Sequence, residues 1–377
     1  MSDRFIYLDY AATHPVTETA KKALEESLSW FANPSSPHAP GKKAKARLEE
    51  CRKGMRELLL AKKTFDLIFT SGATESNNMA IGGRDYGSED EILCSEVSHP
   101  SLLAPSKKTQ ALWRPIPLEE GRVTPRSLKE ALSERVKLVV LDHVNSQTGL
   151  ICDVEACAQA LVHEAAEKGM ERPHIHVDAS QSLARVPLSL KSESIDSLTL
   201  SGHKIGAPKG IGALLAKRYT LRPMIWGGGQ EGGLRSGTEN LSLAFAFTQC
   251  AREGVEGKGR ERIRELKKDL ILGLKDLGAR FPFDQGQAAP HICTFIHPAQ
   301  KAQTLLKRLD DEGFFLSQTS ACSSRAESEG GGKTLRALGL SKEEGDHLLR
   351  VSLGFSTTGE EIQCFLQKLR EISRPSP

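Results

Sequence analysis

Hydrophobic and polar positions along the first part of the chain alternate between the strand period and the helix period. Apolar runs of strand length end at polar or glycine residues in FDLIFT, EILC, VKLVVLD, HIHVD, SLTLS and GALLAK. Helices are predicted from about Thr17 to Trp30 and from about Asp153 to Gly169. A longer one between them carries Ala44, Leu48, Cys51, Met55 and Leu58 on one face. Strands and helices that alternate with short links predict a doubly wound α/β sheet.

The pattern changes at the glycine-rich stretch WGGGQEGGLRSGTEN. A long helical region from about Glu239 to Leu277 is predicted to lead into a second domain, which contains HICTFIH and LLRVSLG as strands. The last helix is amphipathic, with Ile362, Phe365, Leu369 and Ile372 on one face. We therefore predict a large domain of residues 14–258 and a smaller α+β domain formed by residues 1–13 and 259–377.

Composition narrows the classes of function. The 377 residues are too many for one small core, and 51 Lys and Arg against 48 Asp and Glu leave no dense basic block for nucleic acid. The N-terminus lacks the layout of a signal peptide, and no apolar run approaches the roughly 20 residues that span a bilayer. Eight cysteines without a CxxC pair indicate reduced thiols and no zinc site. We expect a cytoplasmic protein that binds neither membrane nor nucleic acid directly.

One lysine stands apart from the solvated helix faces that most lysines occupy. Lys204 follows the strand SLTLS within LTLSGHKIGAPKGIG, among small residues and glycines. A lysine at the mouth of a strand is either a point charge for phosphate or a covalent carrier of a carbonyl cofactor.

Two further strand ends favour the cofactor. TSGATES follows a strand and opens a helix, so its backbone N–H groups and Thr74 are either an ordinary helix start or a phosphate site. Asp178 ends HIHVD and is either a cap or a buried acid that needs a cation. A phosphate loop, an aspartate and a lysine together fit pyridoxal 5'-phosphate (PLP). Lys204 would form its Schiff base, and Asp178 would keep its ring nitrogen protonated.

Cys322 differs from the other cysteines. From Cys322 to Leu335 the chain offers only small, polar or charged side chains, so we predict an exposed and reactive thiol there. Six others follow helical or strand patterns and are predicted to be buried and inert, while Cys152 is undecided. The six are Cys51, Cys94, Cys157, Cys250, Cys293 and Cys364.

Three other residues have two interpretations each. Arg350 in LLRVSLG lies either on the wet side of a half-buried strand or in a clamp for a carboxylate. His99 either starts a helix or stacks on a ring and moves protons. Thr238 in RSGTEN either caps a helix or binds phosphate.

The chain resembles the cysteine desulfurases of the NifS/IscS-like group in the class V aminotransferase family. The motifs that carry the resemblance run in order along the chain: LDYAAT, NPSSPH, TSGATESNNMAI, HVDASQS, SGHKIGAPKGIGAL, GGGQEGGLRSGTEN, SACSS and RVSLG. The resemblance implies PLP fold type I, with a mostly parallel sheet flanked by helices in the large domain. It implies conversion of L-cysteine to L-alanine, with the sulfur held as a persulfide on Cys322.

The resemblance also implies the roles of single residues. Lys204, Cys322 and His99 would be catalytic, and Asn33 and Arg350 would hold the cysteine carboxylate. Thr238 would reach the phosphate of a neighbouring subunit, which implies a homodimer. The remaining cofactor contacts would come from Ala73, Thr74, Asn145, Ser146, Asp178, Gln181, Ser201 and His203.

Two positions depart from the family pattern. Ser146 in HVNSQTG replaces an asparagine that contacts the cofactor hydroxyl, so this contact is lost, made through water or taken over by Asn145. Gly206 stands where an aromatic residue is usual, and the loop after Cys322 is slightly longer than usual.

The expected partner is a protein that accepts sulfur, either an iron–sulfur scaffold or a tRNA-thiolation protein. The alternatives are a selenocysteine lyase, another class V PLP aminotransferase or lyase, and a non-catalytic scaffold. A nucleotide-binding dehydrogenase is excluded because no GxGxxG follows the first strand.

Overall fold

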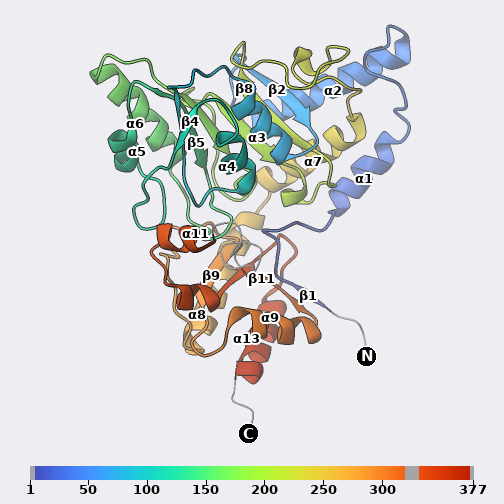
Figure 1. The fold of residues 1–377 in the computed structure, drawn as a ribbon. Coiled ribbons are helices and arrows are strands. Elements are labelled where there is room, and N and C mark those ends of the chain that lie inside the picture. Colours follow the sequence, from blue (N-terminus) through green and yellow to red (C-terminus); the bar gives the residue numbers. More distant parts are fainter. Residues whose placement is uncertain (1–4, 319–330, 374–377) are drawn as a thin grey trace.

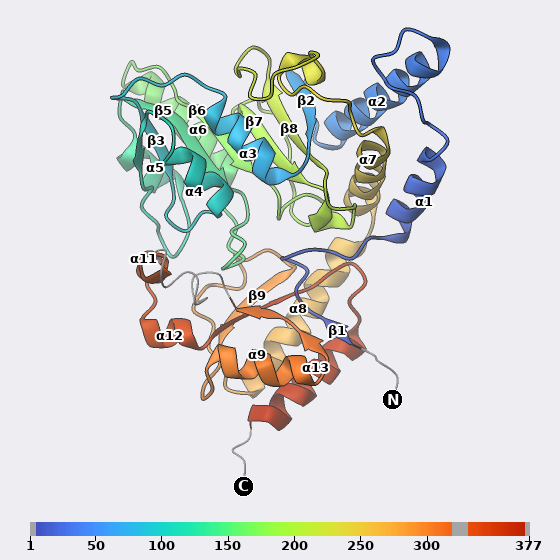
Figure 2. The same cartoon turned by 45° about the vertical axis from the view of Figure 1, so that its right-hand side comes forward.

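The structure is a computed structural model that describes residues 5–318 and 331–373. Its elements form two groups, one above the other in Figures 1 and 2. Among the described residues, no helix is both long and apolar enough to cross a membrane.

The larger group is built on a seven-stranded sheet in the order β2-β8-β7-β6-β5-β3-β4. Only β8 runs antiparallel to its neighbours, so the mostly parallel sheet predicted from the sequence is confirmed. The strands are β2 (Phe65–Thr70), β3 (Glu91–Cys94), β4 (Leu112–Arg114), β5 (Val136–Asp142), β6 (His174–Asp178), β7 (Ser197–Ser201) and β8 (Gly212–Lys217).

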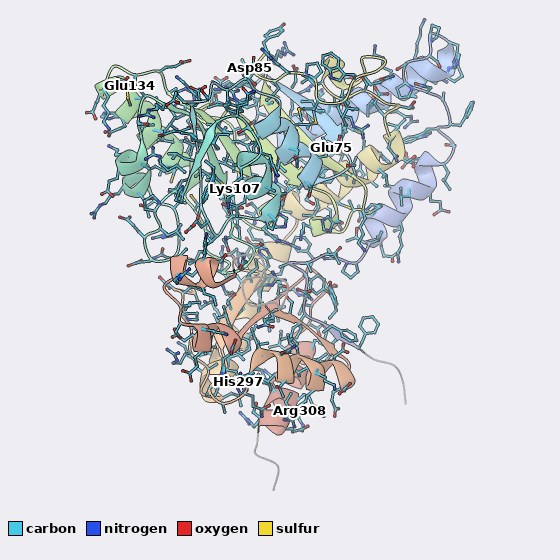
Figure 3. The ribbon with its side chains drawn as sticks, viewed as in Figure 1. Glu75, Asp85, Lys107, Glu134, His297 and Arg308 are labelled. Atoms are coloured by element: carbon cyan, nitrogen blue, oxygen red, sulfur yellow. The ribbon has the colours of Figure 1, made fainter. Side chains whose placement is uncertain are left out.

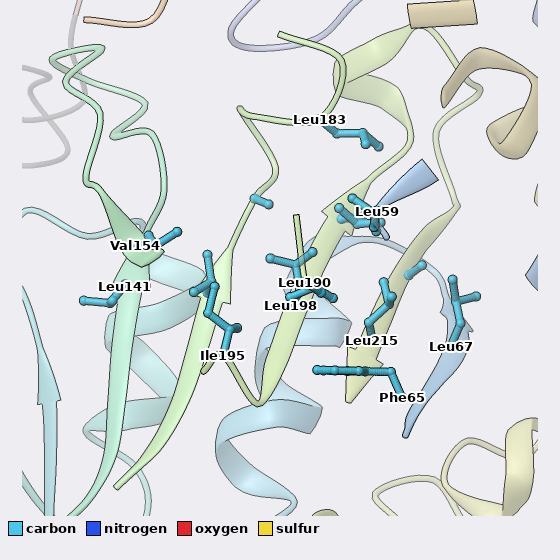
Figure 4. Packing of buried hydrophobic residues seen from close by; sticks show 14 of the residues in the cluster. Leu59, Phe65, Leu67, Leu141, Val154, Leu183, Leu190, Ile195, Leu198 and Leu215 are labelled. Carbon is cyan, nitrogen blue, oxygen red and sulfur yellow. The ribbon is translucent and has the colours of Figure 1, made fainter. Parts of the chain in front are cut away.

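Helices cover both faces of this sheet because both faces of its strands are apolar. Val139 and Leu141 of β5 belong to the main core, which α2, α6 and α7 cover (Figure 4). Leu138 and Val140, which alternate with them, face the side that α3 and α4 cover. The helices of this group are α1 (Glu18–Ser27), α2 (Ala39–Leu58), α3 (Ala73–Gly82), α4 (Pro100–Ser106), α5 (Pro125–Ala131), α6 (Val154–Glu167) and α7 (Leu241–Glu256).

The smaller group has its own antiparallel sheet and its own core. The sheet has the order β11-β12-β9, and β1 pairs with β10 in parallel. Its strands are β1 (Ile6–Tyr7), β9 (Ile292–Ile296), β10 (Phe314–Phe315), β11 (Ser317–Gln318) and β12 (Leu348–Ser352). Its helices are α8 (Gly259–Asp276), α9 (Ala302–Asp311), α11 (Gly331–Ala337), α12 (Lys342–Asp346) and α13 (Gly359–Ser373).

The long helical region predicted from Glu239 to Leu277 is two helices, which are separated at Gly257. Gly257 has extended backbone angles, which end α7 before α8 begins. Since α7 packs against α1 and α2 while α8 packs against α13 and β9, the chain passes here from one group to the other. The division into residues 14–258 and residues 1–13 with 259–377 remains our proposal for the domains.

Two local predictions are wrong. Thr238 does not cap α7, because the Oδ1 atom of Asn240 accepts the hydrogen bond from the Leu243 N–H at 3.0 Å. Cys364 is exposed, whereas the other predicted buried cysteines are buried, and so is the undecided Cys152. Its position on α13 lies away from the buried stripe of Ile362, Phe365, Leu369 and Ile372.

The exposure of Cys364 predicts a simple difference in thiol reactivity. Cys364→Ser should lower by one the number of thiols that react rapidly with a water-soluble disulfide reagent in the folded protein. Cys293→Ser is the matched control, because burial raises the pKa of that thiol to about 12 and the folded protein keeps it from the reagent. An unchanged count in Cys364→Ser would show that this face of α13 is covered in solution.

Candidate active site

A cavity of about 550 Å³ lies between the carboxyl ends of β5, β6 and β7 and the smaller group of elements. In parallel sheets such strand ends are the usual place for a ligand. The predicted site residues that line it are Ala73, Thr74, His99, Ser146, Asp178, Gln181, Ser201, His203, Lys204 and Arg350. Asn33, Asn145 and Thr238 do not line it, and Cys322 lies outside the described residues.

Lys204 reaches the cavity from a short 3₁₀ turn, His203–Ile205, directly after β7. Its Nζ donates hydrogen bonds to the carbonyls of Ala11 at 2.5 Å and Ala12 at 2.8 Å. Burial lowers its pKa to about 8, and the nearby cations of Arg185 and Arg350 add to this effect. A sizeable fraction of the amine is therefore neutral near physiological pH, as a nucleophile or a base requires.

The turn that presents Lys204 depends on Gly206. This residue has φ +88°, and a Cβ there would lie 2.4 Å from the Cγ2 atom of Thr17. Its carbonyl accepts a hydrogen bond from the N–H of Thr17, the residue whose side chain caps α1. The departure at Gly206 thus follows from the close approach of α1.

Asp178 is buried at the end of β6. Its Oδ2 accepts a hydrogen bond from Asn77 Nδ2 at 2.7 Å, and its Oδ1 accepts one from the Ser180 N–H at 2.8 Å. It is therefore both the cap of a local turn and a buried acid. Two N–H donors stabilise the carboxylate form.

The start of α3 forms a cradle for an anion. The helix begins after Gly72 without a side-chain cap, and its first residues line the cavity, so the N–H groups of its first turn have no capping partner. A Cβ at Gly72 would meet nothing within 4 Å, which leaves open space there. The buried hydroxyl of Ser201, which also lines the cavity, has no hydrogen-bond partner. These unpaired donors fit a phosphate-bearing group.

Charged groups surround this cradle. Glu75, labelled in Figure 3, lies in the first turn of α3 and forms an ion pair with Arg235 at 2.8 Å. Lys209 and His203 line the cavity, and burial lowers the pKa of His203 to about 4. His203 is therefore neutral at pH 7, and lysines supply the positive charge.

His99 starts a helix, as one of its two interpretations predicts, and its role in stacking on a ring and moving protons stays a prediction. It caps α4, since its Nδ1 accepts a hydrogen bond from the Ser101 N–H at 3.1 Å, and it also lines the cavity. Burial lowers its pKa, against the opposing charge of Asp178. The neutral ring thus accepts at Nδ1 and carries its proton on Nε2.

Arg350 is buried in β12, so its interpretation as the wet side of a half-buried strand is wrong. Its Nη2 donates to Asp9 Oδ1 at 2.8 Å and to Ser317 Oγ at 2.7 Å. Its Nη1 donates to the backbone carbonyl of Ser146 at 2.8 Å. A buried cation held by one carboxylate at the cavity wall is suited to exchange that partner for an anionic ligand.

The side-chain amides of Gln181 and Asn145 differ in position. Gln181 lines the cavity, donates to the Ala11 carbonyl at 2.8 Å and accepts from His291 Nε2 at 3.2 Å. Asn145 donates to the Val97 carbonyl and accepts from the N–H groups of the following turn. Its amide is used within that turn and does not line the cavity, which favours the other two alternatives for the contact at Ser146, its loss or a contact through water.

Asn33 and Thr238 are both exposed outside the cavity. Asn33 accepts a hydrogen bond from the Ser35 N–H at 2.8 Å. Their roles toward substrate and cofactor stay predictions.

A second acid, Asp142, was missed by the sequence analysis. It lines the cavity and is paired in register with Asp178 across β5 and β6. Burial and, to a lesser extent, the charge of Asp178 together raise its pKa to about 7. The signal was present in the sequence, because Asp142 ends VKLVVLD as Asp178 ends HIHVD.

Known proteins resemble this chain along nearly its whole length. The family model "Aminotransferase class-V" matches residues 6–365. A cysteine desulfurase IscS of Dictyoglomus turgidum is 32% identical over 384 residues, which cover 98% of this chain and 94% of that protein. A solved NifS-like protein superposes with a TM-score of 0.87 at 26% identity, covering 98% of this chain and 99% of its own. SspA, solved in complex with cysteine, gives a TM-score of 0.77 at 28% identity, with 93% and 99% covered.

The raised pKa of Asp142 predicts how stability depends on pH. Because its pKa in the folded state lies above that of the unfolded chain, its contribution is present below pH ~4 and is lost as pH rises through about 7. Asp142→Asn removes this loss, so the variant should gain stability over the wild type, and on the order of 2 kcal/mol more at pH 8 than at pH 5.

Thermal unfolding of both proteins without added cofactor, at the two pH values, measures this difference. Asp276→Asn, at an exposed position on α8, should change the midpoint equally at both. An equal effect of Asp142→Asn at both pH values would contradict the raised pKa.

Proposed function

The chain belongs to the aminotransferase class-V family and is a PLP-dependent cysteine desulfurase of the NifS/IscS-like group, and we propose that its chemistry takes place in the cavity around Lys204. The observation that carries this proposal is the convergence of Lys204, Asp178 and the unpaired donors of α3 and Ser201 on one cavity. The reaction is L-cysteine plus an enzyme thiol giving L-alanine plus an enzyme persulfide, which balances without an added oxidant. We assign the thiol to Cys322.

The residues of this cavity would hold PLP from three sides. Lys204 would bind it covalently, Asp178 would contact its ring nitrogen, and His99 would cover its ring. Its phosphate would be held by the N-terminus of α3 with Ala73 and Thr74, and by Ser201 and His203. Gln181 and Ser146 would lie toward its ring hydroxyl. When bound, PLP supplies a sink for the electron pair that is left on the substrate Cα.

Lys204 would move the proton of that step. Its pKa of about 8 allows the amine to accept a proton from Cα and to return it, and the carbonyls of Ala11 and Ala12 hold its Nζ in the cavity wall. Asp178 would keep the ring end of the site negative throughout.

Arg350 would bind the substrate carboxylate. Its ion pair with Asp9 and its bond to Ser317 keep the guanidinium in place in the absence of substrate. A cysteine carboxylate would compete with Asp9 for the same N–H groups, which makes the site selective for amino acids.

The further parts of the proposal concern partners. The persulfide of Cys322 would pass to a protein thiol, of an iron–sulfur scaffold or a tRNA-thiolation protein, in the cytoplasm. We propose a homodimer in which Thr238, exposed outside this cavity, contributes to the site of the second subunit.

Removing Lys204 tests the cofactor assignment. Lys204→Ala should lose the visible absorbance that a lysine-bound cofactor gives, and with it essentially all formation of alanine from cysteine. The matched control is Lys22→Ala, which removes an exposed lysine of α1 outside the cavity and should keep the absorbance. Unchanged absorbance in Lys204→Ala would show that another amine carries the cofactor and would contradict the role of Lys204.

Removing Cys322 tests the nucleophile. Cys322→Ala should keep the cofactor absorbance and lose persulfide formation and sulfide release from L-cysteine by about 100-fold or more. Cys364→Ala, at the exposed cysteine of α13, should keep full activity. Retained desulfuration by Cys322→Ala would point to a lyase that needs no cysteine, and a preference for selenocysteine as substrate would then identify a selenocysteine lyase.

A further inference from the structure

A strip of buried polar residues lies between the centre of the large sheet and the helices α3 and α4. Apolar contacts on this face form two separate clusters, one around β3, β5 and α4 and one around β2 and β8. Between them β6 and β7 present histidine, serine and aspartate side chains. Buried polar groups cost stability unless each is paired, so their arrangement indicates a function.

The strip is a continuous series of hydrogen bonds that ends at Asp178. Its members, from the outer end inward, are Arg84, His174, Ser197, His176, Asn77 and Asp178. The successive distances are 3.0, 3.0, 2.9, 3.1 and 2.7 Å.

The two ends of the series fix the direction of every bond in it. The guanidinium of Arg84 can only donate, so His174 accepts at Nδ1 and donates from Nε2 to Ser197. The Ser197 hydroxyl then donates to Nδ1 of His176, whose Nε2 donates to Asn77 Oδ1. This bond leaves the Asn77 amide N–H groups for the carboxylate of Asp178, which can only accept.

Both imidazoles must be neutral for this series to exist. Burial lowers the pKa of His174 to about 3 and that of His176 to about 4, so both rings stay neutral across physiological pH. The direction derived from the geometry therefore agrees with the electrostatics of the strip.

Asn77 also reaches the other side of the site. Its Nδ2 lies 2.9 Å from Ser101 Oγ, which lies 2.8 Å from Nδ1 of His99. One amide thus contacts Asp178 directly and His99 through a hydroxyl. These two residues face the cavity from different elements, β6 and α4.

The contact between Asn77 and Asp178 is important because a second carboxyl, that of Asp142, also lines the cavity. Asp142 lies beside Asp178 in register, and two adjacent carboxyls do not both ionise readily. The other titratable groups near Asp142 are Cys94 on β3, Cys152 after β5 and His99 on α4, none of which is a cation at pH 7. Asp142 also has donors, Ser98 and the backbone N–H of His99, but burial outweighs them and raises its pKa. The donors on Asp178 therefore favour the negative charge there.

We propose that Asn77, oriented by His176, is a positioning residue that keeps the negative charge on Asp178 and the proton of His99 on Nε2. This inference rests on the proposed function, in which Asp178 pairs with the cofactor ring. It adds that the pH range of cofactor binding is set by a hydrogen-bond series behind the site.

The direction of the hydrogen bonds in the series can be measured without an activity assay. In the full-length protein labelled with ¹⁵N-histidine, His174 and His176 should both be neutral and protonated on Nε2 from pH 5 to pH 8. His176→Gln and His174→Gln assign the two signals. A proton on Nδ1 of His176, or its titration in this range, overturns the proposal.

The effect on Asp178 is tested by the pH dependence of cofactor binding. PLP is titrated into cofactor-free Asn77→Ala and wild-type protein at pH 6 and pH 8. Loss of a donor to a charged group should weaken binding about 10-fold at pH 8. At pH 6, where Asp142 and Asp178 compete for a proton, the loss should be about 100-fold. Equal losses at both pH values would indicate a merely structural role and overturn the proposal.

Matched variants separate the parts of the series. Asn78→Ala, at the exposed next position of α3, should bind PLP as the wild type does. Ser101→Ala should raise the pKa of His99 and leave the ratio of affinities between pH 6 and pH 8 unchanged. His176→Gln keeps an N–H donor and should restore most of the affinity that His176→Leu loses at pH 6. None of these titrations uses cysteine, so they distinguish this proposal from the desulfurase assignment.

Discussion

The buried carboxylate of Asp178 is the constraint on which the site depends. An isolated charge in the interior is costly, so the fold must supply donors to it from neighbouring elements. Asn77 on α3 and the N–H of Ser180 do so, and the strip behind Asn77 divides the apolar core of this face into two clusters. The contact of α3 and α4 with the sheet is thus polar in the strip that leads to Asp178 and apolar in the two clusters beside that strip.

The cations of the site are arranged in a complementary way. Arg185 is fully buried, and burial lowers its pKa to about 10, while Arg350 is held by Asp9. Both lie near Lys204 and, together with its burial, favour its neutral form. Opposite charges on the two sides of one cavity therefore serve different ends: cations make the lysine reactive, and the carboxylate of Asp178 suits the ring of an electron-accepting cofactor.

Most of the fold and much of the site could be predicted from the sequence. The strand and helix periods predicted the parallel sheet, and polar residues at strand ends predicted Lys204 and Asp178, because such ends meet at one edge. Arg350 lies in the middle of β12 in the other sheet, and it was singled out as a cation within a strand. Features that leave no periodic pattern in the sequence were missed or predicted wrongly. The break between α7 and α8 depends on the backbone conformation of Gly257 alone, and the residue that caps α7, Asn240, lies two positions after the predicted cap. Asn77 was missed because its partners, Asp178 and His176, lie far away in sequence.

The departures from the family pattern can now be ranked by what they touch. Gly206 lies close to Thr17 at the start of α1 and does not line the cavity. At Ser146 the contact to Arg350 comes from the backbone carbonyl, which any residue supplies, so the side chain is free to vary without loss of that bond. Asp142, which is not one of these departures, matters more for the site, because it is a second ionisable group beside the carboxylate of Asp178. A site with two adjacent acids works only if the structure determines which of them is protonated and which is charged. Hence the hydrogen bonds behind Asp178 matter as much as the residues that face the substrate.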